Sequence, residues 1–256
     1  MDALLEIRDL SIAFGGLKAV QDFSLTLARG DLQGLIGPNG AGKTTVFNLL
    51  TGVYRPQAGT VRLGTRVLNG LRPHQIAAAG VARTFQASRL FADLTVHDNV
   101  RIGCQVRATH GLWATVWRTA RHVADERRIR ARCEQLLATF GLTKRRGELA
   151  RNLPYGDQRR LEMARALATD PQVLLLDEPA AGMNPPEKLA LRELIRSVRT
   201  QFDVTILLIE HDMGVVMDIC ERITVLDYGV TIAVGTPQEV QRDARVIAAY
   251  LGTPAA

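Results

Sequence analysis

The sequence predicts an α/β fold with a parallel sheet, preceded by an antiparallel β subdomain. Continuous apolar runs at 173–176 and 204–209 are flanked by segments of helical pattern, which is typical of strands buried in a parallel sheet. Alternating apolar and polar residues at 4–14 and 20–27 predict two antiparallel strands. A short apolar strand at 32–36 leads from this region into a glycine-rich loop.

A helical insertion is expected in the middle of the chain. The helical pattern that starts at Val96 is interrupted only at Gly103 and Gly111. No internal repeat or low-complexity stretch separates this block from the rest of the chain. We therefore expect a single domain over 1–256, with an inserted helical subdomain at about 96–168.

The composition is that of a folded protein. The 256 residues are 46% hydrophobic, and a chain of this length buries roughly three quarters of its unfolded surface, which excludes bulk disorder. The start lacks a basic segment followed by an apolar stretch, and no apolar run approaches the ~18 residues that span a bilayer. We therefore expect neither export nor self-insertion. Three widely spaced cysteines, Cys104, Cys133 and Cys220, form no disulfide framework, which favours the reducing cytosol.

Positive charge is concentrated in one stretch. The chain has 32 Lys and Arg against 26 Asp and Glu, a net charge of +6, and residues 118–146 alone hold nine basic and three acidic residues. Such a stretch can bind nucleic acid or a membrane surface, or it can be a solvated helix face. Aromatic residues that could stack on bases are limited here to Trp113 and Trp117, just before the stretch. We favour the solvated face and expect no nucleic-acid partner.

The glycine-rich loop indicates the class of chemistry. Residues 37–44 match the pattern G-x-x-x-x-G-K-[ST] after a strand and before a helical pattern, which disfavours a glycine turn without a ligand. Glycines leave backbone N–H groups free to surround phosphate oxygens, and the following helix dipole attracts negative charge. Lys43 would reach the β and γ phosphates, and the Thr44 hydroxyl would ligate Mg²⁺. The ATP-binding residues expected in this loop are Gly37, Pro38, Asn39, Gly40, Ala41, Gly42, Lys43, Thr44 and Thr45.

A phosphate loop also needs a carboxylate for its metal ion. The apolar run that ends at Leu176 is followed by Asp177 and Glu178, which is the form that such a carboxylate takes. Asp177 would hold Mg²⁺ through water, and Glu178 would polarise an attacking water as general base. Two adjacent acids can also cap a helix. That alternative is disfavoured because an acidic pair at the buried end of an apolar strand is costly without a partner.

Five further segments stand in a characteristic order along the chain. They are Phe14, upstream of a Lys-Ala-Val segment; Arg83-Thr84-Phe85-Gln86; Leu153-Pro154-Tyr155-Gly156-Asp157-Gln158 with the helical run that follows; Asn184; and Glu210-His211-Asp212. With these motifs, the chain resembles the ATP-binding subunits of ABC transporters from about Leu4 to Gly252. The resemblance implies the P-loop NTPase fold of ABC ATPases and the use of ATP and Mg²⁺.

The resemblance assigns a role to each segment. Phe14 would stack on adenine, Gln86 would contact Mg²⁺ and relay to the membrane subunit, and His211 would act as the switch histidine. The segment 153–158 would be the signature motif, which completes the ATP site of the opposite subunit. Asn184 lies at the usual Asp of the loop that crosses the dimer. The implied catalytic set is Glu178, His211 and Gln86, and the implied metal set is Thr44, Gln86 and Asp177.

Four segments carry a subfamily signal. They are Ala82–Gln86, Tyr155–Arg160, Ala180–Pro185 and Ile209–Met213. Together they resemble the LivG type, one of two ATPases of branched-chain (hydrophobic) amino acid importers. The lipopolysaccharide-export ATPase has similar sequence motifs, but the Gly-Met-Asn-Pro loop and the His-Asp-Met tripeptide favour the importer.

The resemblance also implies an assembly. Its partners would be membrane permease subunits, a second ATP-binding subunit in a hetero- or homodimer and, indirectly, an extracytoplasmic solute-binding protein. The chain would lie peripherally on the cytoplasmic face of the plasma membrane. The transported solute stays open, because the binding protein and the permease choose it.

Two positions depart from the family pattern. Pro154 replaces a Ser whose hydroxyl and N–H contact the γ-phosphate of the opposite subunit, and proline supplies neither. Asp157 replaces the usual Gln, whereas Gly156 and the dipole of the following helix remain as anion contacts. We therefore expect unequal ATP sites in the assembly.

Two other classes of protein with a phosphate loop fit the sequence less well than a transporter subunit. A soluble ABC ATPase acting on nucleic acid or ribosomes usually carries tandem cassettes, long coiled coils or zinc modules, and the sequence has none of them. A P-loop metabolite kinase would leave the signature motif and His211 without a role.

Overall fold

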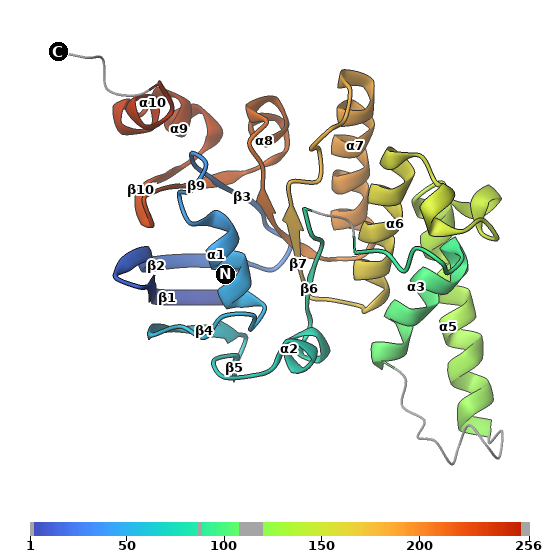
Figure 1. Ribbon diagram of the computed structural model, residues 1–256. Helices are drawn as coiled ribbons and strands as arrows, with labels where there is room; N and C mark the ends of the chain where they lie inside the picture. The colour runs from blue at the N-terminus through green and yellow to red at the C-terminus, as the bar shows by residue number, and fades with distance from the viewer. Residues whose placement is uncertain (1–2, 87–88, 108–119, 252–256) are drawn as a thin grey trace. The chain divides into compact units, whose positions relative to one another are not determined.

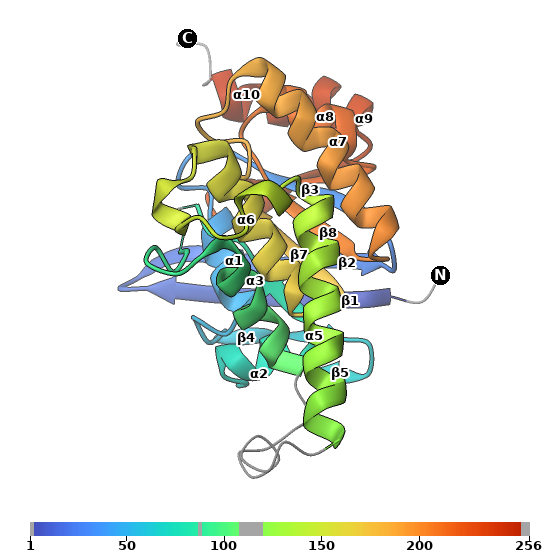
Figure 2. The same ribbon diagram turned by 90° about the vertical axis from the view of Figure 1, so that its right-hand side faces the viewer.

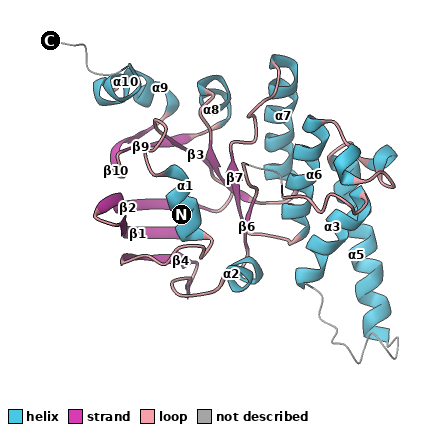
Figure 3. Ribbon diagram, in the orientation of Figure 1, coloured by secondary structure: helices cyan, strands magenta, loops and turns pink. Residues whose placement is uncertain are grey.

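Figure 1 shows the computed structural model of the chain, which describes residues 3–86, 89–107 and 120–251. Its described strands form a four-stranded sheet in the order β2-β1-β4-β5 and a six-stranded sheet in the order β10-β9-β3-β8-β7-β6. Figure 3 distinguishes these strands from the helices. The predicted α/β fold class is confirmed. The positions Gly111, Trp113, Trp117, Arg118 and Gly252 lie outside the described residues.

The four-stranded sheet is antiparallel. Its strands are β1 (Ala3–Phe14), β2 (Leu17–Ala28), β4 (Ala58–Leu63) and β5 (Arg66–Val67). Ile7 of β1 lies opposite Leu25 of β2, and Leu10 lies opposite Phe23. These four side chains are buried, so the alternation in the sequence reflects one inward face, and the prediction of two antiparallel strands is confirmed.

The six-stranded sheet is parallel except at one edge. Its strands are β3 (Leu32–Ile36), β6 (Val81–Arg83), β7 (Val173–Asp177), β8 (Thr205–Ile209), β9 (Arg222–Asp227) and β10 (Val230–Gly235). Only β10 pairs in antiparallel fashion, with β9. Every residue of β3, β7 and β8 is buried, which confirms the predicted short strand at 32–36 and the strands predicted from the continuous apolar runs at 173–176 and 204–209. The loops that follow these parallel strands therefore emerge at the same edge of the sheet.

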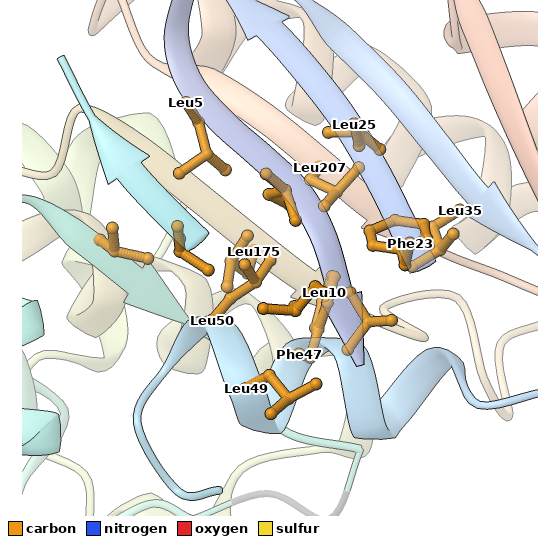
Figure 4. Close-up of a cluster of buried hydrophobic side chains, with 14 of the residues drawn as sticks. Leu5, Leu10, Phe23, Leu25, Leu35, Phe47, Leu49, Leu50, Leu175 and Leu207 are labelled. Atoms are coloured by element: carbon orange, nitrogen blue, oxygen red, sulfur yellow. The ribbon is translucent and has the colours of Figure 1, made fainter. Parts of the chain in front are cut away.

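The apolar core joins the two sheets to the first helix (Figure 4). Phe47 and Leu50 of α1 (Lys43–Leu50) are fully buried in one cluster with Leu10, Leu175 and Leu207. These residues come from β1, β7 and β8, so α1 is fixed to both sheets. The loop that precedes α1 is consequently held at both of its ends.

The chain forms two compact units, one of 1–83 with 172–256 and one of 84–171. The predicted helical subdomain, 96–168, falls within the second unit. The first unit contains α1, α2 (Pro73–Ala79), α7 (Pro185–Gln201), α8 (Met213–Ile219), α9 (Pro237–Arg242) and α10 (Ala244–Leu251). No helix within the described ranges is both long and apolar enough to cross a membrane.

The second unit is helical in its described part. It contains α3 (Val96–Cys104), α5 (Ala120–Thr139), α6 (Tyr155–Ala168) and short 3-10 turns at Gln105–Arg107, Thr143–Arg145 and Ala150–Asn152 (Figure 2). Gly103 is the residue before the last of α3, so the α-helix ends within one residue of the expected break. A Cβ on Gly103 would lie 2.5 Å from the backbone O of Arg165 and 2.7 Å from the Cβ of Ala168. Glycine therefore allows α3 and α6 to approach closely.

Candidate functional site

The loop between β3 and α1 depends on glycines. Gly37 has φ 152° and Gly42 has φ 104°, conformations that residues with side chains rarely adopt. A Cβ on Gly37 would lie 2.0 Å from the backbone O of Leu226, and one on Gly42 would lie 2.4 Å from that of Ala19. Both positions therefore require glycine, as a loop that wraps phosphates with its backbone does.

Lys43 begins α1, and its side chain lies back over the loop. Its Nζ donates to the backbone O of Gly37 at 2.7 Å and of Pro38 at 2.9 Å, and the residue is 7% exposed. Burial lowers the pKa of Lys43, and the negative charges of Glu178 and Asp177 oppose that shift. The ammonium group is thus held in the loop, within the field of both carboxylates.

The remaining loop residues lie around the start of α1. Asn39, Gly40 and Thr44 are exposed, Thr45 is half-buried, and Ala41 is buried. The first backbone N–H groups of a helix have no partner inside the helix, and they carry the positive end of its dipole. The start of α1 can therefore receive phosphate oxygens.

Asp177 ends β7 and is 3% exposed. Its Oδ2 accepts a 2.7 Å hydrogen bond from Nη2 of Arg83, the last residue of β6. Nη1 of Arg83 donates to Oδ1 of Asn48 at 2.7 Å, and the guanidinium carbon lies 5.4 Å from the ring centre of Phe47. The buried charge of Asp177 is thereby compensated, and Arg83 ties β6 and β7 to α1.

Glu178 follows Asp177 with φ 47°, a left-handed conformation that is uncommon for glutamate. Its N–H donates to the backbone O of Ile209 at 2.9 Å. Its Oε2 lies 3.8 Å from Nδ1 of His211, whose side chain is 58% exposed. The helix-cap alternative for the acidic pair is wrong, because α7 begins only at Pro185.

Phe14 ends β1 and is 44% exposed. Its ring packs edge-on against Tyr54, with ring centres 5.1 Å apart and an interplanar angle of 65°. Both rings stay partly exposed, so an aromatic surface is available on which a flat base could stack.

In the second unit, α6 holds the backbone around Gln86. Arg159, which is 5% exposed, donates to the backbone O of Phe85 at 2.8 Å and also to that of Gln86. The Glu162 carboxylate accepts from the Phe85 N–H at 2.9 Å and from Arg159 at 3.2 Å. Burial raises the pKa of Glu162, and these contacts oppose the shift. The backbone of this segment is therefore fixed to α6, while the Gln86 residue is exposed.

The predicted signature segment, 153–158, forms the start of α6. Leu153 is buried, and its carbonyl accepts from Nε2 of Gln158 at 2.9 Å. Pro154 precedes the first turn with φ −53° and ψ 151°, and its carbonyl accepts from the Gln158 N–H at 3.0 Å. Gly156 lies in the first turn and is half-buried. Pro154 thus fits the helix start without supplying a side-chain cap.

Side chains of the same segment are engaged within their own unit. The Asp157 carboxylate lies 3.2 Å from Nε of Arg145 and 3.7 Å from Nη1 of Arg160. The Tyr155 hydroxyl accepts from Nε and Nη2 of Arg159 at 2.9 and 2.6 Å. The departure at Asp157 is therefore built into a local arginine network, and Tyr155 belongs to the same network.

Asn184 caps α7. Its Oδ1 accepts from the Glu187 N–H at 3.0 Å, and the Glu187 carboxylate accepts from the Asn184 N–H at 2.9 Å. This capping box fixes the start of the helix. The role of Asn184 in a dimer stays a prediction.

Three residues of this region have contacts that the sequence motifs do not predict. They are Tyr54 beside Phe14, Arg83 beside Asp177, and Glu210, which is fully buried and accepts from the Ala180 N–H at 2.6 Å. For Arg83 and Glu210 a usable signal exists, because each is a charged residue at the end of an apolar strand. The same signal identified Asp177.

Comparison with known proteins identifies the family. The family model described as "ABC transporter" matches residues 20–181. The chain is 47% identical over 249 residues to the "High-affinity branched-chain amino acid transport ATP-binding protein LivG" of Salmonella typhimurium, which covers 97% of this chain and 98% of the relative. The chain belongs to the ABC transporter family. The resemblance stated from the sequence motifs is confirmed.

Three further comparisons agree with this placement in the ABC transporter family. The "Lipopolysaccharide export system ATP-binding protein LptB" of Escherichia coli is 33% identical, with 98% of both chains covered. A solved structure described as an ATP-binding cassette of an ABC transporter superposes with a TM-score of 0.85 at 26% identity, covering 98% of this chain and all of that one. A second model, "Branched-chain amino acid ATP-binding cassette transporter", matches residues 230–256. The predicted ABC ATPase fold is thereby confirmed.

Proposed function

We propose that this chain is the ATP-hydrolysing subunit of a membrane importer for branched-chain amino acids. One observation carries the proposal: the phosphate loop with Lys43 and the acids Asp177 and Glu178 follow strands of one parallel sheet and emerge at the same edge. The cargo is supported by the name of the 47% identical relative and by the family match at 230–256.

Hydrolysis would use the residues at this edge. ATP would lie with its phosphates in the loop 37–44 and its base against Phe14. Lys43 would neutralise charge on the β and γ phosphates. As a water oxygen attacks the γ phosphorus and ADP leaves, Glu178 would accept the proton that the water releases. His211, 3.8 Å from Glu178, would orient that carboxylate and the γ-phosphate.

The oxygen donors fit Mg²⁺. No group of three or more His, Cys, Asp or Glu that could hold a metal occurs within the described residues. Mg²⁺ in phosphoryl-transfer sites is usually held by one or two carboxylates, substrate phosphates and waters, so such a group is not required. Asp177, the Thr44 hydroxyl and the Gln86 amide are the proposed protein donors. When bound, the ion would stabilise the charge that develops on the phosphate oxygens.

The proposed assembly contains a second ATP-binding subunit and membrane permease subunits. Two ATP-binding subunits would enclose two ATP molecules, each phosphate loop facing the 153–158 segment of the other, with Asn184 in the loop that crosses between them. Binding of ATP would close this pair, and hydrolysis would release it. The Gln86 segment would relay the change to the permease at the cytoplasmic face of the membrane, and an extracytoplasmic solute-binding protein would deliver the amino acid.

Transport by the assembled complex tests the proposal. The chain and the subunits that co-purify with it are placed in proteoliposomes, and uptake of labelled leucine, isoleucine and valine is measured. Uptake of labelled urea and release of lipopolysaccharide are measured in the same preparation for comparison. We expect amino acid uptake that requires ATP and stops in Glu178→Gln. ATP hydrolysis without such uptake would overturn the proposal that the cargo is a branched-chain amino acid. Absence of ATP hydrolysis would overturn the proposal that the chain is an ATPase.

A further inference from the structure

A second buried carboxylate lies beside the proposed catalytic pair. Glu210, the residue after β8, is 0% exposed. Its Oε1 accepts from the N–H of Ala180 at 2.6 Å, and its Oε2 accepts from those of His211 at 3.1 Å and Asp212 at 3.3 Å. Burial raises the pKa of Glu210, and these N–H groups together with the charge of His211 oppose the shift. Because a buried carboxylate is costly without partners, the three N–H groups stabilise it.

These N–H groups belong to two different loops. Ala180 lies in the turn that follows Glu178, whereas His211 and Asp212 lie in the loop between β8 and α8. Oε1 holds the first loop and Oε2 holds the second. One side chain therefore joins the loop of the proposed base to the loop of the proposed switch histidine, whose side chains lie 3.8 Å apart.

The turn after Glu178 depends on such anchors. Glu178 has φ 47°, and a strained backbone of this kind persists only where its neighbours hold it. Its N–H donates to the Ile209 carbonyl at 2.9 Å, and the Ala181 N–H closes the turn on the Glu178 carbonyl at 3.2 Å. The next anchor of the turn is the bond from Ala180 to Glu210.

We propose that Glu210 is a positioning residue for ATP hydrolysis, which sets the Glu178 carboxylate against His211 by holding the backbones of both loops. The inference rests on the proposed function and deepens it. Glu210 lies outside the phosphate loop and acts through Glu178 and His211. Its substitution should therefore lower turnover and leave ATP binding unchanged.

The variant Glu210→Gln, in the assembled complex, is the first test. Glutamine keeps the shape, but one carboxylate oxygen becomes an amide group that donates and cannot accept, so one loop loses its acceptor. We expect kcat to fall by about tenfold, as for a lost hydrogen bond to a charged group. KM and the Kd of a labelled ATP analogue should stay within about twofold of the wild-type values.

A matched control separates positioning from lost stability. Val198→Ala removes buried apolar atoms from α7, away from the loops of the site, and should lower the thermal unfolding temperature while kcat stays at the wild-type level. If Glu210→Gln fails to fold, Glu210→Asp, which keeps the charge on a shorter side chain, is judged by the same measurements. Thermal unfolding curves of all variants show which of them fold, and kcat is compared among the folded variants.

A second background makes the test specific. In Glu178→Gln there is no base to position, so adding Glu210→Gln should change the residual hydrolysis by less than about twofold. An equal loss in both backgrounds, a wild-type kcat in the single variant, or a loss of ATP affinity that accounts for the whole effect would overturn the proposal. A wild-type complex that hydrolyses no ATP would instead overturn the proposed function.

Discussion

The predicted phosphate loop, 37–44, and the predicted signature segment, 153–158, are built in opposite ways. In the phosphate loop the backbone makes the site, since Gly37 and Gly42 adopt conformations reserved for glycine and Lys43 folds back onto the loop carbonyls. In the segment 153–158 side chains bind their own unit, and Asp157 lies between two arginines. The start of α1 can offer backbone N–H groups to a ligand, whereas the Asp157 carboxylate of the second segment pairs within its own unit.

This difference explains why one segment keeps its pattern and the other has changed. A backbone site fails if a single Cβ is added, as the 2.0 Å approach of a Cβ on Gly37 to Leu226 shows. A helix start still presents N–H groups and a dipole when Pro154 replaces a serine. We therefore expect substitutions to have large effects at the phosphate loop edge and moderate effects at the signature segment.

The largest effect is expected for Glu178→Gln. The amide keeps the shape but lacks the basic lone pair, so hydrolysis should fall by a factor on the order of 10² or more while ATP affinity is kept. Steady-state hydrolysis and binding of a labelled ATP analogue measure the two quantities. Glu193→Gln, on the exposed side of α7, is the matched control and should hydrolyse normally. Normal turnover in Glu178→Gln would reject Glu178 as the base.

Lys43→Ala should lower the affinity for ATP. It removes the charged donor held over the loop, and one hydrogen bond to a charged group corresponds to a roughly 10- to 100-fold loss of affinity. Equilibrium binding of the same analogue measures this loss. Lys144→Ala, an exposed lysine of the second unit, should bind as the wild type does. Unchanged affinity in Lys43→Ala would mean that the loop is no phosphate site.

Pro154→Ser sharpens the comparison at the signature segment. Serine restores the hydroxyl and N–H of the family pattern, so hydrolysis at the partner subunit's site should rise by about tenfold while this chain's own phosphate loop is unaffected. The assembled complex is measured with and without the partner's general base disabled. Equal stimulation of both sites, or none, would contradict unequal sites and leave Pro154 as a neutral residue at the helix start.

The smallest effect is expected when nucleic acid is added to the purified protein. Each acidic residue of the basic stretch 118–146 is paired with an arginine. The pairs are Asp125 with Arg128 at 3.2 Å, Glu126 with Arg101 at 2.9 Å, and Glu134 with Arg146 at 3.4 Å. In ~0.15 M salt we expect no shift of duplex DNA or RNA at sub-micromolar protein in a gel assay, because phosphate binding weakens steeply with salt. A shift would favour the soluble ATPase class.

The parts predictable from sequence are those set by local pattern. Strands β7 and β8 follow from continuous apolar runs, β3 follows from a short apolar segment, and the loop 37–44 follows from glycine spacing. The acids Asp177 and Glu178 could be found because they end such a run. These features need no knowledge of which distant segments meet.

The remaining features depend on distant contacts. From the sequence Gly103 predicts only a helix break, whereas its close approach to Arg165 and Ala168 of α6 becomes apparent only in the folded unit. Arg83 and Glu210 each stand out as a charged residue at the end of an apolar strand. The distant partner, Asp177 for Arg83 and the Ala180 N–H for Glu210, is not visible in the neighbouring residues. The arginine partners of Asp157 likewise become apparent only in the folded unit.

The order of the six-stranded sheet has a consequence for association. Its edges are β6 and β10. β6 has only three residues, and the pairing of β10 with β9 shifts register between Thr231 and Ala233. Short or irregular edge strands are poor templates for a strand of another chain, so a strand of a second molecule would pair poorly with either edge of this sheet. In the proposed assembly, contacts made at these two edges would therefore be left to loops and helix ends, where association can be made and undone without breaking a continuous ladder of backbone hydrogen bonds.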